Sequence, residues 1–160
     1  MLELPQLPES AKGQGDLGAI VDLLDRVKIS IDVTDGMGLT ALHVATITSQ
    51  VDAAQLLLTR GASPHKRAAE FQNGTALHAA AHEGNVKMAR VLLAAGAPVG
   101  ATDDDGGSAL HTAVTAGDAA VTRLLLDAGA PVDLANGKGF TALHLASQFG
   151  NEELIRVLVA

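Results

Sequence analysis

A four-residue phrase recurs along the chain, and it limits the folds open to this protein more than any other feature. The phrase reads Thr-Ala-Leu-His at residues 40–43, 75–78 and 141–144, and Ser-Ala-Leu-His at residues 108–111. Successive copies begin 35, 33 and 33 residues apart. A period of this length is typical of a supersecondary unit that stacks against copies of itself because it cannot bury its apolar face alone. We therefore expect a stack of repeats.

The residues around each phrase predict two short helices per unit. Thr or Ser is a favourable N-cap, since its hydroxyl accepts a hydrogen bond from an otherwise unpaired backbone N–H. Gly84, Gly117 and Gly150 stand where a left-handed residue can end the first helix. An apolar pair and then Gly-Ala close the second helix in three units, at residues 61–62, 96–97 and 129–130. About ten residues of turn chemistry then lead to the next phrase.

These motifs resemble the ankyrin repeat. The 33-residue period, the Thr-x-Leu-His phrase, the mid-repeat glycine and the Leu-Leu-x-x-Gly-Ala ending match that family's pattern over residues 35–160. The resemblance implies an all-α solenoid of stacked antiparallel helix pairs with β-hairpin-like fingers at one edge. We assign the parts as follows: an irregular N-terminal cap or tail at 1–14, a degenerate capping half-repeat at 15–34, and repeats 1 to 4 at 35–67, 68–102, 103–135 and 136–160.

Two departures from the family's pattern fall in or beside repeat 1. Ser49 occupies the place of the mid-repeat glycine. A left-handed conformation costs a residue with a Cβ about 1 kcal/mol or more, so we expect this repeat to be looser or to turn differently. The finger that follows is two residues longer than the others and carries His65-Lys66-Arg67. That sequence predicts a local basic tip on an acidic protein.

Composition excludes several classes of function. The net charge is −7, which argues against binding to a phosphate backbone because that requires a basic surface. The chain has no cysteine, so a disulfide framework, a thiolate zinc site and a cysteine nucleophile are excluded. The N-terminus does not read as a secretory signal, and the apolar runs are too short to span a bilayer. We expect a soluble intracellular protein, cytoplasmic or nuclear or both, without a nucleic-acid or membrane partner.

No residues stand out as a catalytic, cofactor-binding or metal site. The string Gly13-x-Gly15-x-x-Gly18 matches a dinucleotide-binding motif, but no strand precedes it, so we interpret it as a loop. The histidines of the four phrases would form a ladder along the stack and not a cage for one ion. The resemblance implies that they bond to neighbouring backbone. His78 and His82 have metal-pair spacing, although no Cys or pair of carboxylates completes a site.

The resemblance places the family's contact positions on the fingers and on the exposed face of each first helix, which together line a concave groove. The larger apolar side chains at these positions are surplus to a core of Ala, Leu and Val, and exposed apolar groups on one face mark an interaction site. The alternative is that Phe140 and Phe149 pack locally. The candidate partner-binding residues are Met37, Leu39, Ile47, Phe71, Gln72, His82, Glu83, Asp104, Asp105, Lys138, Phe140, Gln148 and Phe149.

The acidic run Asp103–Asp105 has two interpretations: a solvated finger tip, or a contact for a basic segment of a partner. The last repeat keeps an internal type of apolar set, whereas a terminal repeat needs a polar outer face. We therefore expect that the natural chain continues or that a partner covers this edge, and association through the uncapped C-terminal edge stays open.

The resulting hypothesis is a scaffold that binds another protein, and not an enzyme. The first alternative is a regulatory or targeting module of a longer enzyme, channel or adaptor protein. The second, more remote alternative is a hydrolase or a metal-dependent enzyme, which loss of turnover on His78→Ala or His82→Ala would revive. The sequence does not name the partner.

Overall fold

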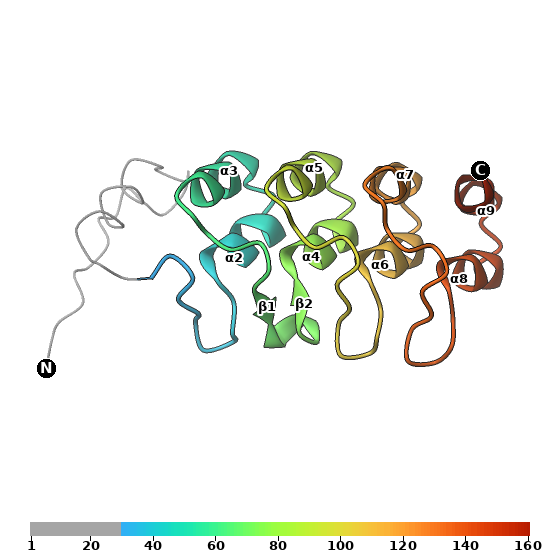
Figure 1. Cartoon of the computed structure of the whole chain (residues 1–160), viewed down its shortest axis with the longest axis horizontal. Coiled ribbons are helices and arrows are strands. Elements are labelled where there is room, and N and C mark those ends of the chain that lie inside the picture. The colour runs from blue at the N-terminus through green and yellow to red at the C-terminus, as the bar shows by residue number, and fades with distance from the viewer. Residues whose placement is uncertain (1–29) are drawn as a thin grey trace, which may run out of the picture.

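The computed structural model describes residues 30–160, and these form four stacked helix pairs (Figure 1). The first helices of the pairs, which we call the inner helices, are α2 (Ala41–Ile47), α4 (Ala76–His82), α6 (Ala109–Ala116) and α8 (Ala142–Gln148). The outer helices are α3 (Val51–Thr59), α5 (Val86–Ala94), α7 (Ala119–Asp127) and α9 (Glu152–Val159). Each row stacks in chain order, with the inner helices next to the projecting fingers (Figure 1).

The solenoid predicted from the repeat is confirmed. We number the fingers 1 to 4, at residues 30–40, 62–75, 97–108 and 130–141. The loop predicted at Gly13 to Gly18 and residues 15–29 of the predicted half-repeat at 15–34 lie outside the described residues.

Each inner helix begins at the Thr or Ser of the repeated phrase. In all four copies the hydroxyl and the imidazole of the histidine three residues later form a capping box. Asn85, Asp118 and Asn151 cap three of the outer helices through their side-chain oxygens. These interactions are local, which explains why the helix starts could be predicted from the sequence.

The core is a thin layer shared by neighbouring pairs. Its buried members are mainly alanines, which let the helices approach closely, with leucines as the most frequent larger side chains. The largest of these apolar side chains are Leu42, Leu77, Met88, Leu92, Leu110, Val114, Val121, Leu125 and Leu154. Because the inner helices of neighbouring pairs contact one another, and the outer helices do the same, the repeats stabilise one another rather than folding alone.

The turn at Ser49 has the same left-handed conformation as those in the other repeats, so the expectation of a different turn is wrong. Ser49 has a φ of 58°, in the same left-handed region as Gly84, Gly117 and Gly150. Its backbone N–H bonds to the Thr46 carbonyl at 3.0 Å, as the N–H of Gly117 bonds to the carbonyl three residues before it at 3.1 Å. The packing of the helix pair therefore imposes the left-handed turn on a serine.

Finger 2 accommodates its extra residues as a small hairpin. Strands β1 (Arg67–Ala68) and β2 (Gly74–Thr75) pair antiparallel around the 3-10 helix η2 (Ala69–Phe71). The predicted basic tip is only partly free, because the guanidinium of Arg67 donates to the Thr102 carbonyl of finger 3 at 2.6 Å. Arg67 therefore links two fingers.

Candidate interaction surface

Main-chain hydrogen bonds connect the finger tips to one another. The Glu70 N–H donates to the Met37 carbonyl at 3.3 Å, and the Asp104 N–H donates to the Gln72 carbonyl at 2.8 Å. The third bond runs from the Gly137 N–H to the Asp105 carbonyl at 2.7 Å. The fingers therefore form one linked edge, and their side chains are held in fixed relative positions.

In three fingers, an Asp or Asn five residues before the cap accepts backbone hydrogen bonds that close the turn. Asp35 Oδ1 accepts from the N–H groups of Met37 and Leu39, both at 2.9 Å. In finger 3 Asp103 Oδ1 accepts from the Gly107 N–H at 2.8 Å, and Asn136 makes the equivalent bonds in finger 4. These turns are stabilised within the finger, as is usual for Asp and Asn.

The phrase histidines attach inner helices to the next finger. Nδ1 of His78 accepts from the Thr75 N–H at 3.1 Å, so the proton lies on Nε2, which donates to the Gly107 carbonyl at 3.2 Å. His111 does the same with the Ser108 N–H and the Phe140 carbonyl. The resemblance implied this structural role, and the geometry of these two residues confirms it.

Burial favours the neutral form of two of these imidazoles. Desolvation lowers the pKa of His78, and the Gly107 carbonyl and Asp103 oppose this only in part. Desolvation also lowers the pKa of His43, with a smaller opposing effect from the Lys66 backbone and Asp32. The charged form is disfavoured because Nδ1 already faces a backbone N–H donor in each case.

His43 differs from His78 in one respect. It is 1% exposed, yet its Nε2 makes no hydrogen bond in the part of the chain that the structure describes. His78 and His111 find a carbonyl at the residue before the next cap, whereas the longer hairpin of finger 2 follows His43. The two inserted residues therefore cost repeat 1 a bond that repeats 2 and 3 make.

Two hollows adjoin on the concave side, between the fingers and the inner helices. The larger one, which we call the central hollow, has a volume of about 640 Å³. The adjoining hollow is about 260 Å³ and shares Gln72, His82, Asp103 and Thr112 with it. The central hollow is lined by Gln72, His82, Asp103, Asp105, Gly107, His111, Thr112, Thr115, Ala116, Asn136, Lys138 and Leu145.

The structure brings five of the candidate residues to these two hollows. Gln72, His82, Asp105 and Lys138 line the central hollow, and Phe71 lines the adjoining one together with Glu70. Phe140 and Gln148 line a separate hollow with Leu143, His144 and Ser147.

The other candidates lie outside those hollows. Met37 and Phe149 are 54% and 56% exposed, and Ile47 is half-buried. Glu83 bonds to the neighbouring His82 at 3.1 Å, and Asp104 accepts from the side-chain amide of Asn73 at 2.7 Å. Each residue except Ile47 is exposed at the surface.

The expectation that Leu39 is exposed is wrong. Leu39 is 7% exposed and belongs to the core. The position before the cap is also buried at Gly74 and Gly107, and it is open only at Phe140, which is 37% exposed. Beside Leu39, a Cβ on Gly38 would lie 3.3 Å from that of Ala69 in finger 2, whereas the atoms nearest to a Cβ on Gly74 or Gly107 belong to the same repeat. Phe140 also packs locally, edge to face on His144 with ring centroids 6.1 Å apart.

Eight lining residues of the central hollow were missing from the candidates. They are Asp103, Gly107, His111, Thr112, Thr115, Ala116, Asn136 and Leu145. A signal for two of them was present, since Asp35, Asp103 and Asn136 stand five residues before their caps. No sequence pattern marked Thr112 and Leu145, because the face of an inner helix that turns toward the fingers depends on how the helix pairs stack.

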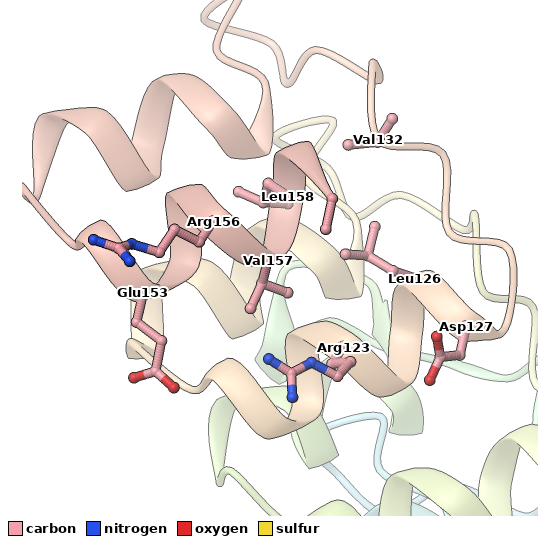
Figure 2. Close-up of a pocket in the computed structure, with 9 residues that line it drawn as sticks. Arg123, Leu126, Asp127, Val132, Glu153, Arg156, Val157 and Leu158 are labelled. Carbon is pink, nitrogen blue, oxygen red and sulfur yellow. The ribbon is translucent and has the colours of Figure 1, made fainter.

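A second hollow of about 640 Å³ lies between the outer helices α7 and α9. Leu126, Val157 and Leu158 form its apolar part, and Arg123, Glu153 and Arg156 stand at its rim (Figure 2). No ion pair joins Arg123 to Glu153 in the described residues; Arg156 bonds to Glu152 at 3.4 Å. This hollow contains no predicted candidate.

Within residues 30–160, no group of three or more His, Asp or Glu side chains is placed to hold a metal ion. No helix among these residues is long and apolar enough to cross a membrane.

Comparison with known proteins gives consistent results. The chain is 36% identical over 93 residues to mouse protein phosphatase 1 regulatory subunit 27. The aligned segment covers 58% of this chain and 59% of that protein. It is 34% identical over 93 residues to human ankyrin repeat and SOCS box protein 3 (58% of this chain, 18% of that protein). It is also 36% identical over 100 residues to the chicken nuclear factor NF-kappa-B p105 subunit (60% and 10%).

The chain thus spans less than two thirds of the length of each of these relatives. The family model described as ankyrin repeats (3 copies) matches residues 9–103 and again residues 95–160. Together with the stacked helix pairs and the linked fingers, these matches identify a protein-interaction module. The chain belongs to the ankyrin-repeat family.

Proposed function

We propose that this protein binds a partner protein in the concave groove formed by the central and adjoining hollows. The observation that carries the proposal is that Gln72, His82, Asp105 and Lys138, from three different repeats, line one hollow. The linked finger tips hold these side chains before a partner arrives, so little conformational entropy is lost on binding. We also propose that the chain has no catalytic activity of its own, which its regulatory-subunit relatives support.

The test is a pair of matched substitutions of exposed alanines on neighbouring helices. Ala116→Trp fills the central hollow from α6 without removing any buried contact, whereas Ala120→Trp places the same ring on the outer helix α7. We expect affinity capture from cell lysate, measured by quantitative mass spectrometry, to lose specific partners with Ala116→Trp and to keep them with Ala120→Trp. Equal capture by Ala116→Trp and the wild type would contradict the groove assignment.

A regulatory role is a second candidate. It is supported by the names of the mouse and human relatives, both called protein phosphatase 1 regulatory subunit 27 and both 36% identical over 93 residues. The same capture experiment tests it: a phosphatase catalytic subunit retained by the wild type and by Ala120→Trp, but lost with Ala116→Trp, is the expected result. A partner set without any enzyme contradicts the regulatory role and leaves the binding role intact.

A further inference from the structure

We infer that the central hollow receives an arginine side chain of the partner protein, and this inference rests on the proposed function. Two carboxylates of finger 3, those of Asp103 and Asp105, line the hollow, and Glu70 adds a third in the adjoining hollow. Lys138 of finger 4 lines the central hollow as well. The groove is therefore acidic where fingers 2 and 3 meet it.

These carboxylates have acceptor capacity to spare. The side chains of Asp105 and Glu70 make no hydrogen bond or ion pair in the described part of the chain. Asp103 uses only Oδ1 within its finger, where it accepts from the Gly107 N–H at 2.8 Å, and its Oδ2 makes no hydrogen bond. Oxygen acceptors that face a hollow without a donor favour a partner that brings several donors.

Repeat 3 contributes small residues to the lining of the hollow. Thr115 and Ala116 occupy positions that carry His82 and Glu83 in repeat 2 and Gln148 and Phe149 in repeat 4. The Thr115 hydroxyl donates to the His111 carbonyl at 2.9 Å, which leaves its oxygen able to accept. Small residues between larger ones leave room for one long side chain.

A guanidinium fits this set better than an ammonium. Its planar fork can bond two carboxylates and a hydroxyl at once and stays charged at neutral pH, whereas lysine offers a compact point charge. A phosphate or an acidic peptide would face Asp103 and Asp105 and be repelled. The interpretation of the Asp103–Asp105 run as a contact for a basic partner segment therefore narrows to an arginine bound in the central hollow.

The experiment is a ¹⁵N–¹H NMR titration of the whole chain with N-acetyl-arginine amide. The neutral isostere N-acetyl-citrulline amide serves as the control. We expect saturable shifts confined to amides of residues 103–107 and 112–116 with arginine, and none with citrulline. Asp105→Asn should weaken arginine binding about tenfold, which is the loss expected for one charge-assisted hydrogen bond.

Two further variants control for general electrostatics. Asp133→Asn removes the same charge from an exposed position outside the hollows and should leave arginine binding unchanged. Lys138→Gln removes a cation that repels the arginine side chain and should tighten arginine binding. Equal shifts with arginine and citrulline, unsaturable shifts spread over all acidic residues, or wild-type affinity in Asp105→Asn would overturn the inference.

The outcomes separate this inference from the proposed function. If Ala116→Trp abolishes partner capture while arginine causes no local shift, the groove binds a partner by other contacts and the inference fails alone. If arginine binds as expected but Ala116→Trp captures every partner, the proposed function fails, and the assignment of this arginine to a partner fails with it.

Discussion

His78 Nε2 lies 3.2 Å from the carbonyl oxygen of Gly107, so an imidazole that caps one helix also holds the finger of the next repeat. His111 and the Phe140 carbonyl repeat this relationship at 3.1 Å. Local helix capping and the stacking of neighbouring repeats thus depend on the same side chain. This coupling allows the two contributions to be measured separately.

The first prediction compares His78→Ala with His144→Ala. Both variants lose the same capping box, but only His78 is buried and bonded to a following finger. We expect His78→Ala to cost about 1–3 kcal/mol more of the free energy of unfolding, from the lost bond and the cavity. Urea unfolding of both variants measures the difference. Equal losses would mean that capping alone accounts for the histidine.

The second prediction concerns pH. Because the pKa values of His43 and His78 are lowered in the folded state, the unfolded chain binds more protons as the pH falls below about 6.5. Their contribution to stability is therefore complete above that pH and is lost as the pH falls toward the folded pKa values. The expected slope is at most about 1.4 kcal/mol per pH unit for each histidine.

Urea unfolding between pH 8 and pH 5.5 checks this dependence, in a window chosen to lie above the usual carboxylate pKa range. His78→Gln should flatten the slope, because an amide does not titrate. His82→Gln, at an exposed position, should leave the slope of the wild type. A slope that survives in both variants and in His43→Gln would contradict the assignment.

The third prediction concerns Ser49 and Gly117, which occupy the equivalent turn in repeats 1 and 3, and exchanges serine and glycine at each position. Ser49 and Gly117 have φ values of 58° and 78°, and a Cβ on Gly117 would meet nothing within 4 Å. The two substitutions therefore change only the free energy that the left-handed backbone conformation costs. Ser49→Gly should stabilise the protein by about 0.5–1 kcal/mol, and Gly117→Ser should destabilise it by about 1 kcal/mol. Thermal unfolding midpoints that move in the same direction for both would refute this explanation.

The fourth prediction concerns the link between fingers 3 and 4. A Cβ on Gly137 would lie 2.8 Å from the Asp105 carbonyl oxygen, which accepts from the Gly137 N–H at 2.7 Å. We expect Gly137→Ala to break this bond and to cost about 1–3 kcal/mol. Hydrogen exchange at the Gly137 amide should become faster.

Gly36→Ala is the matched control for that variant. Gly36 stands at the same distance before its cap, and a Cβ there would meet nothing within 4 Å. It should leave stability nearly unchanged. A similar loss in both variants would attribute the effect to backbone entropy and not to the contact between fingers.

The sequence by itself determined the helix pairs, their starts and the ends of the inner helices that stop at Gly84, Gly117 and Gly150. Thr40, Thr75, Ser108 and Thr141 cap helices through bonds to residues three positions away, so each start was readable within one turn of chain. The glycine at 117 likewise marks a left-handed residue without reference to anything distant. Local hydrogen bonds and backbone sterics operate identically in every copy, which is why a repeated phrase was sufficient.

Only the tertiary structure decided which finger residues are exposed and which are buried. Leu39 is buried beside the contact between Gly38 and Ala69 of the next finger, Arg67 bonds to Thr102, and His43 lacks the bond that His78 makes. Each outcome depends on a neighbour about 30 residues away, and the two-residue insertion in finger 2 shifts that neighbour. The central hollow arises in the same way, from Thr115 and Ala116 lying beside larger residues of adjacent repeats. Contacts between repeats depend on the register of one finger against the next, and that register is set by packing rather than by local sequence.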